Sequence, residues 1–131
     1  MVEYLGVEDV TSIHEETMRR LGDLPQPLVH RAECLAALDR PRWAAYYEQA
    51  DVITQAARLA MGLAKAHPFV DGNKRTAQRC LAVFLHLNGC TVPDDREALA
   101  REIERLTGID LDDGDAPLEA WLRDRVVPTE P

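Results

Sequence analysis

Residues 67 to 75, which read His-Pro-Phe-Val-Asp-Gly-Asn-Lys-Arg, concentrate several chemically active side chains in one short stretch. An imidazole can accept a proton near neutral pH, a carboxylate can bind a divalent cation, and lysine and arginine can neutralise phosphate. Polar groups of this density are costly to place between apolar elements, so we expect them to form a site. The residue types are those that phosphoryl transfer uses.

Two residues of the stretch, His67 and Asp71, each have two interpretations. His67 follows a predicted helix, so it is either a general base for a hydroxyl nucleophile or a histidine that interacts with the end of the helix dipole. Asp71 is either a metal ligand or the N-cap of the next helix. We favour the base because of the eight residues that follow it. We favour Mg²⁺, conditional on a bound nucleotide, because Mg²⁺ binds one or two carboxylates together with phosphate oxygens.

The middle of the stretch is predicted to bind phosphate. Gly72 permits a positive φ and Asn73 tolerates one, so their backbone N–H groups can surround an anion at the start of the next helix. Lys74 and Arg75 add positive charge there. If they were plain surface cations, they would lie at the helix N-terminus, where the helix dipole disfavours positive charge. Phe69 is predicted to anchor the loop in the core.

The remaining sequence predicts an all-α bundle of about six helices, because apolar residues recur at helical spacing almost throughout. The two segments that flank the site, 52–66 and 76–88, are predicted to be central because they are apolar over most of their surface. The other predicted helices are about 10–21, 30–38 (ended by Pro41), a segment with Leu99, Ile103 and Leu106 inward, and a last one with Leu118, Trp121 and Leu122 inward.

Turn signals bound these helices. Gly22, Gly89 and Gly108 are predicted stops, residues 23–27 form a proline-containing loop, and Asp94, Asp95 and Asp115 are predicted caps. Residues 2–5 could form a short N-terminal strand. We expect one domain over residues 1–131.

Several residues outside the stretch are predicted to be structural. His14 lies on an apolar helix face and is interpreted as a hydrogen-bonded core residue, whereas His30 and His86 are surface or packing residues. Trp43, Tyr46 and Tyr47 are expected to pack in the core; the alternative is an edge that docks an extended target segment by strand addition.

Composition limits the possible partners and location. The formal net charge of −8 argues against direct binding to nucleic acid or anionic lipid, so a bound nucleotide needs the local charge of Lys74, Arg75 and Arg79. No apolar run is long enough to span a membrane, and no secretory signal is visible. The three cysteines show no CxxC spacing and are expected to be reduced and buried in a cytoplasmic protein.

The sequence HPFVDGNKRT resembles the signature of the Fic/Doc (Fido) superfamily. The stretches VEDVTSIHEE, LGDLPQPLVHRAECLAAL and FLHLNGC are similar to its death-on-curing branch, and the resemblance extends from about Tyr4 to Val126. It implies that His67 is the base, Asp71 the Mg²⁺ ligand, and Gly72 to Arg75 the phosphate cradle.

The resemblance also implies a function. Fic AMP-transferases usually have glycine where this chain has Lys74, and death-on-curing toxins have lysine there. A toxin of a toxin–antitoxin pair is therefore implied, which uses ATP and Mg²⁺ to phosphorylate a threonine of elongation factor Tu. AMP transfer to a protein hydroxyl and a non-catalytic binding module are the alternatives.

Self-inhibited Fic proteins carry a motif of Ser or Thr, three residues, Glu, and then Gly or Asn. Ser12 and Glu16 have this spacing, but Thr17 follows, so we expect the motif to be absent. Inhibition would then come from an antitoxin protein that docks a helix in a groove near the site.

Overall fold

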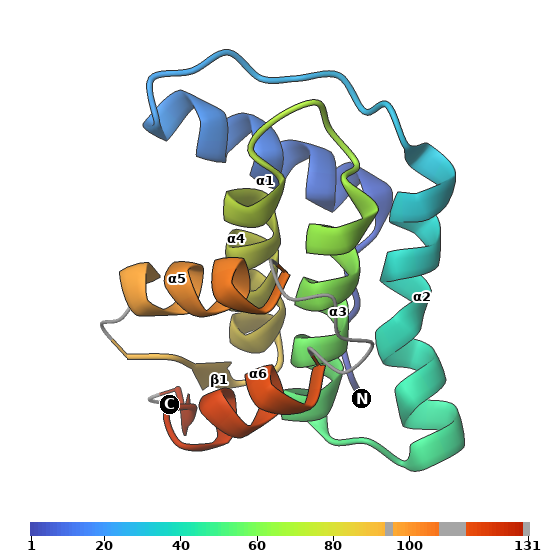
Figure 1. Ribbon diagram of the computed structural model, residues 1–131. Coiled ribbons are helices and arrows are strands. Elements are labelled where there is room, and N and C mark those ends of the chain that lie inside the picture. The colour runs from blue at the N-terminus through green and yellow to red at the C-terminus, as the bar shows by residue number, and fades with distance from the viewer. Residues whose placement is uncertain (94–95, 108–114, 130–131) are drawn as a thin grey trace.

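The computed structural model describes residues 1–93, 96–107 and 115–129 and contains six α-helices and one two-stranded sheet in these ranges. In chain order the elements are α1 (Val7–Arg20), α2 (Arg31–Glu48), α3 (Val52–Ala66), α4 (Asn73–Leu87), β1 (Cys90–Thr91), α5 (Arg96–Thr107), α6 (Asp115–Arg123) and β2 (Val127–Pro128) (Figure 1). The predicted all-α bundle is confirmed.

The helices are arranged around α3 and α4, which lie side by side and are joined by the loop that contains residues 67–72 (Figure 1). Helix α2 packs along α3, α1 packs against α4, and α5 and α6 also contact this central pair. A long connection between α1 and α2 passes near the 67–72 loop (Figure 1). The loop is therefore held between rigid elements on several sides.

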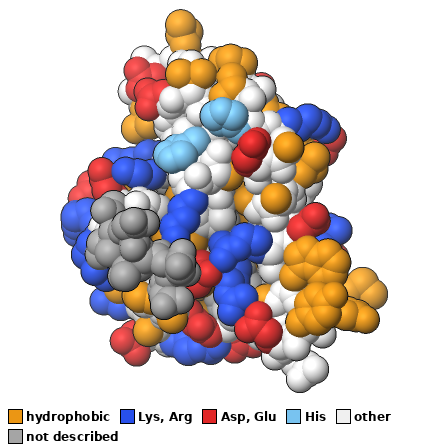
Figure 2. Space-filling view, turned by 45° about the vertical axis from the view of Figure 1, so that its right-hand side comes forward, with side chains coloured by type: hydrophobic (Ala, Val, Ile, Leu, Met, Phe, Trp, Pro, Cys, Tyr) orange, Lys and Arg blue, Asp and Glu red, His pale blue; other side chains and the backbone are white. Residues whose placement is uncertain are grey.

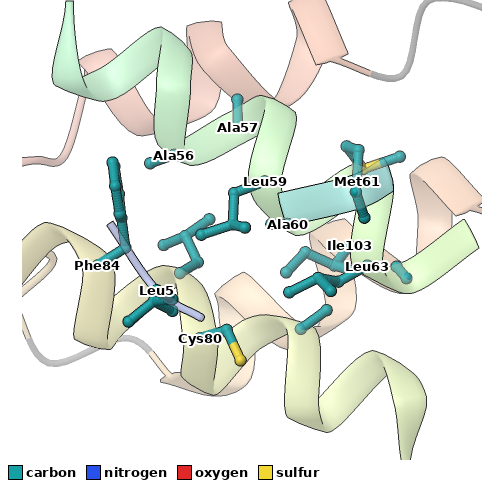
Figure 3. Close-up of a cluster of buried hydrophobic side chains, with 14 of the residues drawn as sticks. Leu5, Ala56, Ala57, Leu59, Ala60, Met61, Leu63, Cys80, Phe84 and Ile103 are labelled. Carbon is teal, nitrogen blue, oxygen red and sulfur yellow. The ribbon is translucent and has the colours of Figure 1, made fainter. Parts of the chain in front are cut away.

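The hydrophobic core is centred on α3 and α4 and includes buried residues from all six described helices. Ala56 and Ala60 of α3, Phe84 of α4 and Ile103 of α5 have no exposed surface, and Figure 3 shows their side chains converging. The alanines allow neighbouring helices to approach α3 closely. Helix α3 begins with a side-chain cap, because Asp51 Oδ1 accepts a hydrogen bond of 3.0 Å from the Thr54 N–H.

Helix α2 contradicts the prediction that Pro41 ends a short helix, because Pro41 lies inside an 18-residue helix. Proline has no N–H, so the Ala37 carbonyl loses its usual helical donor, at a cost of about 3 kcal/mol. Tertiary contacts offset this cost. Pro41 is buried, and the neighbouring Arg40 donates to the Arg58 carbonyl of α3 at 2.6 Å and to the Asp115 carboxylate of α6 at 2.5 Å.

The predicted strand at residues 2–5 is also wrong. Its residue Glu3 pairs with a side chain instead of a strand: the Glu3 N–H donates to Asn88 Oδ1 at 2.8 Å, and Asn88 Nδ2 donates to the Glu3 carbonyl at 3.0 Å. The small antiparallel sheet joins β1 and β2, with Cys90 opposite Pro128.

Most predicted helix ends hold to within a few residues. Gly22 and Gly89 follow α1 and α4 with φ of 78° and 80°. Helix α4 begins at Asn73, three residues before the predicted start, and Asp115 is the first residue of α6, where its carboxylate pairs with Arg40. The predicted caps Asp94 and Asp95 and the predicted stop Gly108 lie outside the described residues.

Inward residues were also predicted well in α5 and α6: Leu99, Ile103, Leu106, Leu118 and Leu122 are buried, whereas Trp121 is half-buried. Cys34 and Cys80 are buried free thiols, and burial raises the pKa of both. Cys90, also free, is only partly buried. Among the described helices, none has the length and apolar character that crossing a membrane requires.

The three aromatic residues of α2 are not in the core, in contrast to the prediction. Trp43, Tyr46 and Tyr47 are 55%, 74% and 70% exposed. They contact one another, with the rings of Trp43 and Tyr47 stacked at 5.5 Å and those of Tyr46 and Tyr47 edge-on at 4.8 Å. A hydrophobic cluster is visible on one side of the surface in Figure 2. Because these residues belong to a helix, whose backbone groups are already paired, they cannot form an edge for strand addition.

Candidate active site

The site is built on the loop between α3 and α4, in which two residues adopt left-handed backbone conformations. His67, directly after α3, has φ 48° and ψ 59°, and Gly72, directly before α4, has φ 77° and ψ 13°. The predicted positive φ at Gly72 is confirmed. The side chain of His67 is exposed, as a residue that receives a proton from an external substrate requires.

Phe69 anchors the loop in the core, as predicted. Its side chain is buried, and its ring stacks on that of His14 of α1, with centroids 3.7 Å apart and an interplanar angle of 5°. His14 is itself completely buried, which confirms its prediction as a hydrogen-bonded core residue. Its Nε2 accepts the Gln26 N–H at 3.0 Å, so Nδ1 carries the proton and donates to Thr76 Oγ1 at 3.0 Å. Burial lowers the pKa of His14 and favours this neutral form.

Asn73 closes the loop with its side-chain amide. Its Oδ1 accepts the Phe69 N–H at 2.9 Å, and its Nδ2 donates to the Phe69 carbonyl at 2.8 Å. Both ends of the amide are therefore used within the protein, and the group that Asn73 offers to an anion is its backbone N–H. The sequence indicated an amide at this position but did not indicate that the amide braces the loop.

Gly72 is required by space as well as by conformation. A Cβ at this position would lie 2.5 Å from Met18 Sδ and 3.5 Å from His14 Cε1. Both neighbours belong to α1, and both are buried. Helix α1 therefore presses directly against the turn that starts α4.

Asp71 is exposed and is not the N-cap of α4, which was the alternative to a metal ligand. The N-cap position is held by Gly72, and Asp71 Oδ1 accepts the adjacent Gly72 N–H at 2.8 Å. Thr76 is the residue whose N–H bonds back to the Gly72 carbonyl, at 2.9 Å. The N–H groups of Asn73, Lys74 and Arg75 precede it in the first turn and have no acceptor within the helix.

These groups surround one open hollow of about 350 Å³, which is lined by His67, Val70, Asp71, Gly72, Asn73, Lys74 and Arg75. The structure thus brings together His67, Asp71 and the four predicted phosphate-binding residues 72–75, whereas Arg79, also predicted to add charge for a nucleotide, does not line this hollow. Lys74 Nζ lies 3.7 Å from Glu104 Oε1 of α5, a contact between exposed groups that is weak enough to exchange for another anion. Figure 2 shows two histidine side chains next to each other on the surface, with lysine and arginine side chains below them.

One participant was missed by the sequence analysis. The segment before α2 pairs with the loop: Leu28 forms an antiparallel bridge with Phe69, and the Val29 N–H donates to the Pro68 carbonyl at 2.8 Å. The His30 side chain bonds to the His67 carbonyl, with Nδ1 and oxygen 2.6 Å apart. The sequence contains no signal for this pairing, because it joins residues 37 and more positions apart.

The residues present fit a magnesium–phosphate pair better than a metal held by protein alone. Within the described ranges no group of three or more histidine, cysteine or acidic residues could enclose a metal. Asp71 offers a single exposed carboxylate beside a helix start with free N–H groups. Mg²⁺ accepts such a site when phosphate oxygens complete its coordination.

The fold and the loop define a class of small helical proteins in which a histidine-containing loop leads into the start of a central helix. A sequence model of the Fic/DOC family matches residues 4–85, more than half of the chain. This chain therefore belongs to the Fic/DOC family.

Two relatives agree with this assignment and with the death-on-curing branch. The chain is 31% identical over 108 residues to "Protein kinase doc" of Escherichia phage P1, covering 82% of this chain and 85% of the relative. It is 42% identical over 103 residues to "Toxin Doc" of Mycolicibacterium smegmatis, covering 72% of each chain.

Proposed function

We propose that this chain is a cytoplasmic toxin that transfers the γ-phosphate of ATP to a hydroxyl group of a protein. A threonine of elongation factor Tu is the target that the family resemblance implies. The observation that carries the proposal is the single hollow in which His67, Asp71 and the start of α4 meet. The names of the two relatives, a protein kinase and a toxin, support the two parts of the proposal.

In the proposed reaction the hydroxyl oxygen of the target forms a bond to the γ-phosphorus. The bond between that phosphorus and the bridging oxygen of the β-phosphate breaks, and ADP leaves. The His67 imidazole accepts the hydroxyl proton. The first-turn N–H groups of α4 bind phosphate oxygens, and Lys74 and Arg75 neutralise the charge that develops on them.

Asp71 would hold Mg²⁺, which supplies positive charge to the phosphate oxygens when it is bound. Lys74 would decide which end of the nucleotide is transferred. A glycine at this position leaves space for the α- and β-phosphates against the N–H groups. A lysine side chain fills that space, so the nucleotide binds in the reverse direction and presents its γ-phosphate.

The test is label transfer in a bacterial lysate, with ATP labelled at the α- or the γ-phosphate in parallel samples. Transfer from the γ-phosphate alone supports the proposed kinase activity, and transfer from the α-phosphate indicates AMP transfer instead. Absence of both labels, with ATP binding retained, would leave a non-catalytic binding module. A matched sample of His67→Ala shows whether any label depends on this site.

We further propose that an antitoxin protein inhibits the chain by docking a helix along α1 and α4, beside the loop. Two smaller hollows continue from the site in this direction. One, of about 130 Å³, is lined by Thr17, Arg20, Leu21, Arg75, Gln78 and Arg79. The next, of about 280 Å³, is lined by Ser12, Ile13, Glu16, Arg79 and Val83. Arg75 is shared with the site hollow, and Arg79 is shared by the two smaller ones.

The lining suits an amphipathic helix with acidic residues, because Ile13 and Val83 supply apolar contact and the arginines supply charge. Glu16, which also lines the second of these hollows, is paired with Arg20 at 2.8 Å. Co-expression of the neighbouring small open reading frame should restore growth. Val83→Asp should weaken that rescue, whereas Leu87→Asp, at an exposed position later on α4, should not. Harmless high-level expression of the chain alone would contradict the toxin proposal.

A further inference from the structure

His67 has a backbone conformation that its own sequence disfavours. Its φ of 48° and ψ of 59° lie in the left-handed region, which is costly for any residue with a Cβ atom. It also precedes Pro68, and a residue before proline is driven towards the extended region. Some other part of the structure must therefore stabilise this conformation.

One usual stabilisation of a left-handed helix end is not possible here. In the Schellman motif, the N–H group of the residue after the left-handed one donates to a carbonyl of the last helical turn. The residue that follows His67 is Pro68, which has no N–H to donate.

The segment that precedes α2 supplies the stabilising hydrogen bonds instead. The N–H groups of Val29 and His30 both donate to the Pro68 carbonyl, at 2.8 Å and 3.1 Å. The side chain of His30 reaches one residue further, and its Nδ1 lies 2.6 Å from the His67 carbonyl oxygen. A carbonyl oxygen only accepts hydrogen bonds, so the proton of His30 must be on Nδ1.

We propose that His30 is a positioning residue whose Nδ1–H holds the His67 carbonyl and so fixes the backbone from which the His67 imidazole projects. Without this bond, the peptide between His67 and Pro68 can rotate towards the extended conformation, and the imidazole turns away from the hollow. The consequence for catalysis rests on the proposed function of His67, but the hold on the backbone does not.

The test compares three substitutions of His30. His30→Ala removes the donor. His30→Asn restores it, because the Asn amide nitrogen is as many bonds from the backbone as Nδ1. His30→Gln places its amide one atom further away and should not restore it. His86→Ala, which removes an exposed histidine from the last turn of α4, is the matched control.

We expect His30→Ala and His30→Gln to lower kcat by about 5- to 10-fold, the effect of losing one hydrogen bond at the reacting group. KM for ATP and for the target should stay within about two-fold, because neither is bound by His30. His30→Asn should recover a kcat close to that of the unmodified chain, and His86→Ala should not change it. Equal kcat in all four variants and the unmodified chain would overturn the proposal.

Nuclear magnetic resonance tests the hydrogen bond between His30 and the His67 carbonyl without any activity measurement. The ¹⁵N spectrum of the unmodified chain should show His30 protonated at Nδ1, and His30→Ala should move the ¹³C backbone shifts of His67 from left-handed towards extended values. Unchanged shifts would refute the inference even if transfer is observed.

If the unmodified chain transfers no label, the proposed function fails while this readout still decides the inference. If His30→Ala does not fold, the difference between His30→Asn and His30→Gln decides it: recovery by Asn alone supports the hold, and equal behaviour refutes it.

Discussion

Substitution of Gly72 by alanine tests the view that α1 presses the active-site loop into place. An alanine with φ near 77° costs about 1–2 kcal/mol because of its left-handed backbone. Its Cβ would also lie 2.5 Å from Met18 Sδ, and forcing extra volume into a buried site costs a further 1–3 kcal/mol, roughly. We therefore expect Gly72→Ala to lower the free energy of unfolding by about 2–5 kcal/mol.

Gly89 offers a matched control for this prediction. Its φ is 80°, nearly the same as that of Gly72, but a Cβ at Gly89 would have no neighbouring atom within 4 Å. Gly89→Ala should cost the backbone contribution alone, about 1–2 kcal/mol. The difference between the two variants, measured by urea unfolding, isolates the steric contribution of Met18.

A double substitution identifies the clashing atom. Met18→Ala alone should be destabilising by about 2–5 kcal/mol, because Met18 is buried. It also removes the sulfur that the new Cβ of Gly72→Ala would meet, so the double variant should lose less stability than the sum of the two single losses. Equal losses for Gly72→Ala and Gly89→Ala, or strict additivity with Met18→Ala, would refute the steric reasoning.

Four further predictions concern the site and its support. His67→Ala should lower label transfer by about 10²–10⁴-fold, without loss of unfolding free energy, because its side chain is exposed; a fully active variant would remove His67 from the mechanism. Asp71→Asn should raise the Mg²⁺ concentration needed for ATP binding measured by titration calorimetry, and full activity of the unmodified chain in excess chelator would contradict this. Lys74→Gly should lower phosphate transfer by about 10²–10³-fold, as judged by product mass, and an unchanged rate would show that Lys74 does not orient the nucleotide. His14 has a folded-state pKa below 6.5, so its neutral form stabilises the fold above that pH, and stability should fall as the pH is lowered below 6.5 and through the folded-state pKa. Urea unfolding measured against pH should show this slope reduced in His14→Gln and retained in His86→Ala; the same slope in His14→Gln would assign it to other groups.

The sequence was sufficient to predict the elements that depend on local pattern. The central helices α3 and α4 and the inward residues of α5 follow from apolar spacing, and the two glycines at the ends of α1 and α4 follow from their conformational freedom. The burial of His14 was also predictable, because it lies on an apolar helix face, and that of Phe69, because an aromatic side chain in a polar loop is expected to anchor the loop in the core.

Where sequence reasoning was wrong, a tertiary contact outweighed a local preference. Pro41 normally ends a helix, but contacts of α2 with α3 and α6 keep it inside one. Residues 2–5 favour a strand, but the Asn88 side chain bonds to the N–H and the carbonyl of Glu3. Tyr46 and Tyr47 are apolar enough for the core, but they lie on the face of α2 that no other described element covers.

The sequence by itself determined which chemical groups this protein carries at residues 67–75 and that two central helices flank them. It could not determine how the groups are aimed, because that depends on contacts between residues far apart in the chain. The tertiary structure decided that the Asn73 amide turns inward to Phe69, that Met18 leaves no room for a side chain at Gly72, and that a segment 37 residues upstream holds His67. A left-handed residue before proline is unfavourable locally, so long-range hydrogen bonds were needed to stabilise it.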